Sequence, residues 1–210
     1  MVDRLELTTE TGTIDVDIDL RPGNGPAVLL LSSRTGSVNL RVSSTYLHRK
    51  QKAYRPVYTE IRSVTGSVTA DILLGHGSNA LIDTTTGTQQ LSIMAYDLST
   101  SYEISNLTTY SRTGSQRVVL KPLDSAYDSI TKLRAEHHSF LTASLDVQYP
   151  SLWLGEVHAE ATLGRVDVTG QGLEYIKHGA REVVAHQGSL ATLEVVQVIC
   201  EGTGSSSFSC

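Results

Sequence analysis

One short phrase recurs along the chain at intervals of 21 to 30 residues, and this repeat limits the folds open to it. The phrase is Thr-Gly followed by Ser or Thr, and its five clear copies centre on Gly12, Gly36, Gly66, Gly87 and Gly114. Three weaker copies centre on Ala143, Gly164 and Gly188. A propeller blade needs four strands in about 40 residues. The observed spacing instead fits a unit of two strands.

Apolar and polar residues alternate on both sides of each glycine. After the first one, Ile14, Val16 and Ile18 alternate with acidic residues. Such a period of two predicts strands with one buried face. Thr-Gly-Ser is a poor two-residue hairpin, whereas glycine suits a corner because it adopts positive φ without steric cost. We therefore expect an all-β fold: a parallel, two-sheeted β-solenoid of about eight rungs, with long loops on one edge.

Stacked rungs predict columns of equivalent residues. Five residues after the glycine, successive rungs carry Asp17, Arg41 and Asp71. Two residues before it, the first two rungs carry Glu10 and Arg34, and three after it the fifth and sixth carry Arg117 and Asp146. Opposite charges on neighbouring strands indicate exposed ladders.

A threonine precedes the glycine in successive rungs, at Thr11, Thr35, Thr65, Thr86 and Thr113, followed by Thr142. A regular outward threonine array would indicate an ice-binding surface. Strand parity favours the opposite orientation, because Thr65 shares a face with Ile61 and the seventh rung has Leu163 in this column. We therefore expect an internal hydroxyl ladder that bonds corner backbone groups.

Two long segments are candidates for a ligand surface. The segment from Ser43 to Pro56 holds Tyr46, His48, Arg49, Lys52, Tyr54 and Arg55. The segment from Gly170 to Glu182 holds Tyr175, Lys177, His178 and Arg181. Basic residues among aromatics bind phosphates, glycans or acidic partners. Loops at equivalent rung positions share one edge, so we expect these residues to converge there. Two alternatives to a ligand surface remain. The first segment is a solvated insertion without a binding role, or the tyrosines pack the loops onto the rod.

The segment between the fifth and sixth rungs predicts a short helix near 124–134. Ala126, Tyr127, Ile130 and Leu133 have helical spacing after a cap at Asp124-Ser125. His137-His138 follows, and a histidine pair without further ligands is a weak metal signal.

No metal or cofactor is expected. Asp15, Asp17 and Asp19 are the only weak metal candidates. The alternative for this stripe is a solvated acidic edge that hinders end-to-end strand pairing.

Composition excludes several classes of partner. The net charge of -5 and the pI of about 5.8 argue against nucleic acid. No run of 18 apolar residues occurs, so membrane insertion is not expected. We find no His-Glu-x-x-His, Gly-x-Ser-x-Gly, P-loop or dinucleotide fingerprint.

The sequence predicts a single β-solenoid domain over residues 1–200 and a flexible Gly/Ser-rich tail over 201–210. Cys200 and Cys210 either form a disulfide or stay as thiols. A native start at Met1 would place the chain in the cytoplasm, whereas a trimmed signal would place it outside the cell or on its surface.

The Thr-Gly-Ser-Val/Ile repeats between alternating strands resemble the adhesin-type β-solenoid domain family of bacteria and fungi. The resemblance spans roughly Leu5 to Val198 and is clearest at Ser33–Val42, Ser63–Ile72 and Ser111–Leu120. It implies a β-solenoid and is uninformative about activity.

We expect a non-catalytic binding or adhesin-like module that recognises a glycan, a small anionic ligand or a protein partner through the loop edge. Copies could also associate through the solenoid ends. The alternative is an enzyme of lyase, isomerase or cyclase type, with His, Tyr and Asp residues where the loops converge. A structural or ice-binding rod is the lesser alternative.

Overall fold

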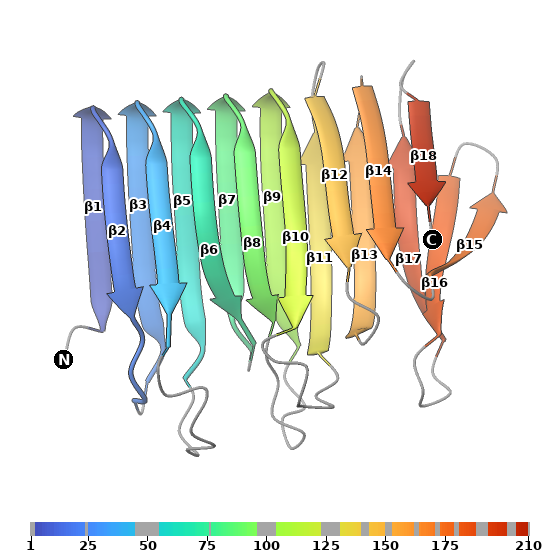
Figure 1. The fold of residues 1–210 in the computed structure, drawn as a ribbon, viewed down its shortest axis with the longest axis horizontal. Helices are drawn as coiled ribbons and strands as arrows, with labels where there is room; N and C mark the ends of the chain where they lie inside the picture. Colours follow the sequence, from blue (N-terminus) through green and yellow to red (C-terminus); the bar gives the residue numbers. More distant parts are fainter. Residues whose placement is uncertain are drawn as a thin grey trace.

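The fold is a two-sheeted parallel β-solenoid, as the repeat predicted, and we describe it from a computed structural model. The structure describes residues 3–23, 25–44, 55–75, 77–95, 104–122, 131–139, 143–149, 153–161, 164–170, 173–178, 181–187, 193–200 and 205–209. Strands of the two sheets run in opposite directions and stack side by side along the rod, with the N-terminus at one end (Figure 1).

The ten-stranded sheet, here called sheet A, has the order β1-β3-β5-β7-β9-β11-β13-β17-β16-β15. Its strands are β1 (Arg4–Thr11), β3 (Ala27–Thr35), β5 (Val57–Thr65), β7 (Asn79–Thr86), β9 (Ser105–Thr113), β11 (Thr131–Ser139), β13 (Trp153–Ala161), β15 (Leu173–His178), β16 (Arg181–Gln187) and β17 (Leu193–Cys200).

The eight-stranded sheet, sheet B, has the order β18-β14-β12-β10-β8-β6-β4-β2. Its strands are β2 (Ile14–Asp19), β4 (Val38–Ser43), β6 (Val68–Leu74), β8 (Gln89–Ala95), β10 (Gln116–Pro122), β12 (Ala143–Tyr149), β14 (Gly164–Gly170) and β18 (Ser205–Ser209). Neighbouring strands pair in parallel throughout this sheet.

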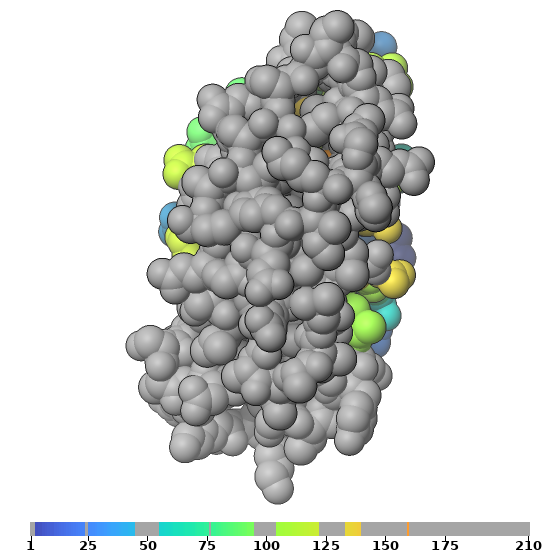
Figure 2. All heavy atoms as spheres, turned by 90° about the vertical axis from the view of Figure 1, so that its right-hand side faces the viewer, coloured from blue at the N-terminus to red at the C-terminus, as the bar shows by residue number. Residues whose placement is uncertain are grey.

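The core lies between the two sheets and is built from the alternating apolar residues. Leu31 and Ile61 of sheet A and Val38 and Ile72 of sheet B are almost fully buried. In the view along the rod axis, atoms of the described residues are visible at the left and right sides of the molecule (Figure 2). The outer faces of the two sheets therefore offer the accessible surface, while the inner faces form the core.

The Thr-Gly-Ser phrases form sharp corners along one edge of the rod, which is the upper edge in Figure 1. Gly12, Gly36, Gly66, Gly87 and Gly114 all have positive φ, between 126° and 146°. Each corner bonds the next along the rod, since the nitrogen of Gly36 donates to the carbonyl of Thr65 at 2.8 Å. The glycine corners predicted for these five positions are confirmed.

The predicted charge ladders are also present. Arg41 lies 3.7 Å from a carboxylate oxygen of Asp17 and 3.8 Å from one of Asp71. Arg34 lies 3.3 Å from Glu10. The strand register pairs Arg117 with Asp146, as expected.

The predicted inward orientation of the threonine column is wrong. Thr35, Thr65 and Thr86 are exposed, as are Thr11 and Thr113. Val64, next to Thr65, is also 49% exposed, so the alternation of faces stops one residue before each threonine. A buried hydroxyl ladder does exist, two residues before these threonines, at Ser33, Ser63, Thr84 and Ser111, and Ser139 continues it in register with Ser111. Thr142 lies outside the described residues.

The chain departs from the simple repeat near its C-terminal end. The expected short helix near 124–134 is wrong where it can be compared, because Thr131–Ser139 is strand β11 and 123–130 lie outside the described residues. The strands on either side of Gly188, β16 and β17, pair antiparallel within sheet A. The rung count therefore differs slightly from the expected eight.

The segment predicted to be a flexible tail contributes a strand. Ser205–Ser209 form β18, which pairs with β14 in parallel. Cys200 ends β17, and Cys210 lies outside the described residues. Among the described residues, no helix has the length and apolar character that a membrane span requires.

Candidate functional site

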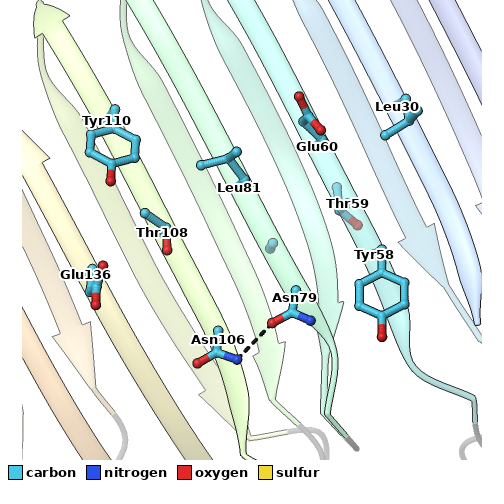
Figure 3. Close-up of a pocket in the computed structure, with 11 residues that line it drawn as sticks. Leu30, Tyr58, Thr59, Glu60, Asn79, Leu81, Asn106, Thr108, Tyr110 and Glu136 are labelled. Atoms are coloured by element: carbon cyan, nitrogen blue, oxygen red, sulfur yellow. Dashed lines mark hydrogen bonds between the residues drawn. The ribbon is translucent and has the colours of Figure 1, made fainter.

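A shallow groove crosses the outer face of sheet A from β3 to β11 (Figure 3). It encloses about 460 Å³. Its outward side chains are Leu30, Tyr58, Glu60, Asn79, Leu81, Asn106, Thr108, Tyr110 and Glu136. A second hollow of about 270 Å³ shares Leu30 and Glu60 and continues the groove toward β1. The face is therefore hollowed over several adjacent strands.

The parallel register arranges these side chains in rows that run along the rod. One row holds Tyr58, Asn79 and Asn106. The next holds Leu30, Glu60, Leu81, Thr108 and Glu136, one residue from each strand between β3 and β11. Each strand supplies alternate residues to this face, so residues far apart in sequence become neighbours.

Two exposed tyrosine rings lie diagonally across the middle of the groove, Tyr58 on β5 and Tyr110 on β9. Tyr58 is 40% exposed and Tyr110 is 41% exposed. They lie two strand steps apart, and the register places Tyr110 four residues further along its strand. At ~4.8 Å per strand and ~3.3 Å per residue, this is a diagonal of roughly 16 Å. In Figure 3 Tyr110 and Tyr58 stand diagonally opposite each other, Leu81 and Thr108 lie between them, and the asparagine pair lies in the same row as Tyr58.

A histidine supports one of these rings. His138 stacks on Tyr110 with ring centroids 4.8 Å apart and an interplanar angle of 10°. Stacking of this kind restricts the rotation of the tyrosine and favours one orientation of its ring. The ring of Tyr110 is therefore held in place by a neighbour on β11.

The asparagine pair offers hydrogen-bonding groups to a ligand. Asn106 donates from Nδ2 to Oδ1 of Asn79 at 2.8 Å. This bond orients both amides, and it uses only one donor of Asn106. The Nδ2 donors of Asn79 and the Oδ1 acceptor of Asn106 then lie on the groove surface, where they match a ligand with hydroxyl groups.

The two carboxylates of the groove are too far apart to act as a hydrolytic pair. Glu60 and Glu136 lie in one row, three strand steps apart. This corresponds to about 14 Å at ~4.8 Å per step, whereas glycosidase carboxylates are about 5–9.5 Å apart. Glu60 also pairs with Arg62 at 2.6 Å on its own strand. The arrangement suits binding better than cleavage.

The first predicted ligand segment is described only at its two ends, 43–44 and 55–56. Tyr46, His48, Arg49, Lys52 and Tyr54 lie outside the described residues. Arg55 is 5% exposed and forms an ion pair with Asp3 at 2.5 Å. The buried guanidinium lines a hollow at the N-terminal end of the rod and is not part of the groove on sheet A.

The second predicted segment belongs to the C-terminal end of sheet A. Tyr175, Lys177 and His178 belong to β15, and Arg181 belongs to β16. In sheet A, six strands separate β15 from β5, which follows the first segment. Seven steps of ~4.8 Å place them roughly 34 Å apart. This distance is between strands only, because all residues of the first group except Arg55 lie outside the described residues.

The weak metal candidates do not form a cluster. Asp15, Asp17 and Asp19 point outward along β2, and Asp17 pairs with Arg41. His137 is fully buried whereas its neighbour His138 faces outward, so the two cannot hold the same ion. Over the described residues, no three His, Cys, Asp or Glu side chains are grouped as metal ligands.

Sequence reasoning missed the groove, although a signal for it exists. Tyr58, Asn79 and Asn106 each stand eight residues before their glycine. Glu60, Leu81 and Thr108 each stand six before it. Alignment of the repeats on the glycine, extended backward along the first strand, would have placed both rows on one face.

Comparison with known proteins gives no identification: the chain matches no protein family, no curated protein and no solved structure.

Proposed function

We infer that this chain is a non-catalytic binding module that recognises a glycan through the groove on sheet A. The observation that carries this proposal is the pair of half-exposed tyrosines, Tyr58 and Tyr110, which lie diagonally across one groove. A tyrosine ring combines an apolar face with a polar tip, so it can pack against a sugar ring and bond its hydroxyls. An adhesin-like role is part of the same proposal.

The groove between the rings has the mixture of groups that a glycan requires. Leu81 gives an apolar floor, while Thr108 and the asparagine pair supply donors and acceptors. Ligand sites typically combine apolar surface with a few polar groups that fix orientation. An open groove on a flat sheet also accepts a chain that runs past both of its ends.

Groove charge favours a neutral glycan over an anionic one. Among the described residues, the side chains that line it include the carboxylates of Glu60 and Glu136 and no lysine or arginine. The nearest arginines are Arg62, which lines the continuation of the groove and pairs with Glu60, and Arg134, which the register places beside Asn106. A polyanion inside the groove would be repelled by the two carboxylates. The anionic ligand expected from the basic loop therefore does not suit this surface.

The experiment is a glycan array followed by titration of the best neutral oligosaccharide against variants. Tyr58→Ala and Tyr110→Ala should weaken binding while the melting temperature stays unchanged. Tyr54→Ala is the matched control, because Tyr54 belongs to the loop expected to bind the ligand. If Tyr54→Ala alone abolishes binding, the loop edge and not the groove is the site.

The exposed threonine column favours a second candidate function, an ice-binding rod. Thr11, Thr35, Thr65, Thr86 and Thr113 occupy successive strands and repeat every ~4.8 Å along one edge. The column is one threonine wide, with half-buried Ser67 and Thr88 bonded to each other on its far side. Thermal hysteresis that disappears in Thr65→Tyr would support this function, and its absence in the unmodified protein would exclude it.

A further inference from the structure

The N-terminal end of the rod exposes an incompletely covered edge of the core. β1 and β2 are the terminal strands of their sheets, and no described strand pairs with their outer sides. The inward residues Val16 and Ile18 are only partly buried, whereas their neighbours in the next rungs, Leu40 and Val42, are at most 3% exposed. Leu7 on β1 is 36% exposed.

A hollow extends this uncovered core. It encloses about 470 Å³, and its apolar lining includes Leu5, Ile18, Leu20 and Leu29. Its charged lining residues have both signs, with acidic Asp3 and Asp19 and basic Arg4, Arg21 and Arg55, and Arg55 pairs with Asp3. An apolar side chain could enter the hollow and cover the last layer of the core.

The charges along β2 indicate which kind of strand would fit. In sheet B, Arg41 of β4 stands between Asp17 of β2 and Asp71 of β6, so in this row each aspartate meets the opposite charge on the neighbouring strand. β2 is the end of this ladder, and Asp15, Asp17 and Asp19 all point outward from it. The next strand in the ladder would carry lysine or arginine at its outward positions.

We propose that the outer edge of β2 is a docking site for a basic β-strand from another protein chain. This strand alternates apolar residues, which cover Val16, Ile18 and the hollow, with lysine or arginine residues, which pair with the aspartates. Its backbone adds to sheet B by strand addition, so main-chain hydrogen bonds contribute affinity and the alternating side chains contribute specificity.

A second copy of this chain does not meet the requirement. Two copies joined through β2 would bring two stripes of three aspartates together, and like charges on facing strands repel. At the other end of sheet B, β18 offers Ser-Ser-Ser-Phe-Ser without a basic residue. The aspartates therefore select a foreign basic strand and oppose self-association.

The experiment uses a nine-residue peptide that alternates valine and lysine, and a matched peptide with glutamate in place of lysine. We expect the lysine peptide to bind and to slow amide hydrogen exchange at β2 and not at β10. Asp15→Asn with Asp17→Asn should weaken binding about tenfold at low salt. Asp71→Asn with Asp83→Asn is the control, because it removes the same charge from interior strands and leaves affinity unchanged.

The proposal would be overturned by equal binding of both peptides, by equal loss in both double variants, or by protection of residues elsewhere than on β2. Dimerisation of the unmodified protein through β2, seen by sedimentation and blocked by the peptide, would also overturn it. Circular dichroism of each variant verifies that the fold is intact, so a loss of binding can be assigned to the edge.

Discussion

The carbonyl oxygen of Gly36 occupies the place where a side chain on Gly66 would begin: a Cβ on Gly66 would lie 2.1 Å from it. The same contact recurs at each later corner, at 1.9 Å between Gly87 and Gly66 and 1.8 Å between Gly114 and Gly87. The glycines are thus required twice, once for positive φ and once for the close stacking of successive corners.

This geometry predicts different costs for the same substitution at two corners. Gly12→Ala meets only the strain of positive φ, because the atom nearest to its Cβ is 3.8 Å away. Gly66→Ala adds a collision with backbone. We expect a loss of about 1–3 kcal/mol in the free energy of unfolding for Gly12→Ala and a clearly larger loss for Gly66→Ala, measured by urea denaturation. Equal losses would show that stacking contributes nothing.

The buried hydroxyl column gives a second prediction. The Oγ of Ser63 is buried and has no hydrogen-bond partner, whereas the Oγ of Ser78 accepts from the nitrogen of Val57 at 3.0 Å and donates to the carbonyl of Gly75. Ser63→Ala removes a hydroxyl that was buried without compensation, so stability should stay within about 0.5 kcal/mol or rise. Ser78→Ala should cost about 1–3 kcal/mol.

Thermal and urea unfolding of these two serine variants provide the measurement. Both substitutions remove only a hydroxyl group from a buried serine, so the cavities that the two variants leave are nearly equal in size. A large loss in Ser63→Ala would mean that its hydroxyl bonds a group not seen in the static structure, such as a bound water.

A polar network inside the core gives a third prediction. Gln116 donates from Nε2 to the carbonyl of His138 at 2.8 Å, which turns its Oε1 toward Thr109. The Thr109 hydroxyl donates to that oxygen at 2.9 Å, so it can only accept from Nδ1 of His137, also 2.9 Å away. The network therefore assigns the proton of a neutral His137 to Nδ1.

Nitrogen chemical shifts of His137 should show the Nδ1-protonated form, and Thr109→Val should cost about 1–3 kcal/mol because it leaves buried partners unpaired. Thr108→Val on the same strand is the control, since Thr108 faces the groove and is only partly buried. A proton found on Nε2 of His137 would contradict the assigned network.

The fold class could be predicted from the sequence because its strongest signal, the repeated Thr-Gly-Ser phrase, marks the positions where the backbone must adopt positive φ. The sequence also placed Asp17, Arg41 and Asp71 in one ladder, because parallel register follows once the glycines are stacked. The prediction was wrong at Thr65, because the alternation of inward and outward residues along the strand was assumed to continue into the glycine corner. Val64 and Thr65 both face outward there, and no periodicity in the sequence marks the point where the strand ends.

The groove illustrates a different limit. Its two rings come from β5 and β9, and neither Tyr58 nor Tyr110 is unusual in its own repeat. Their relationship appears only when the register of the intervening β7 is known. The sequence analysis favoured the long loops because they contain many tyrosine and basic residues. The groove instead depends on a few residues that are aligned across several strands.

The diagonal between the rings predicts how affinity should depend on ligand length. A ligand that spans the roughly 16 Å between Tyr58 and Tyr110 contacts both rings, whereas a shorter one contacts a single ring. With the longest neutral oligomer, Tyr58→Ala and Tyr110→Ala should each lower affinity about tenfold, the usual cost of removing an aromatic anchor.

With the shortest oligomer that binds, only one of the two substitutions should matter, because the other ring lies beyond its reach. Isothermal titration of an oligomer series against the unmodified protein, both single variants and the double variant gives the required comparison. Sensitivity to both tyrosines at every length would mean that the rings act through the fold of the face and not by direct contact. Insensitivity at every length would remove the groove as the binding site, since its two most exposed rings would then contribute nothing.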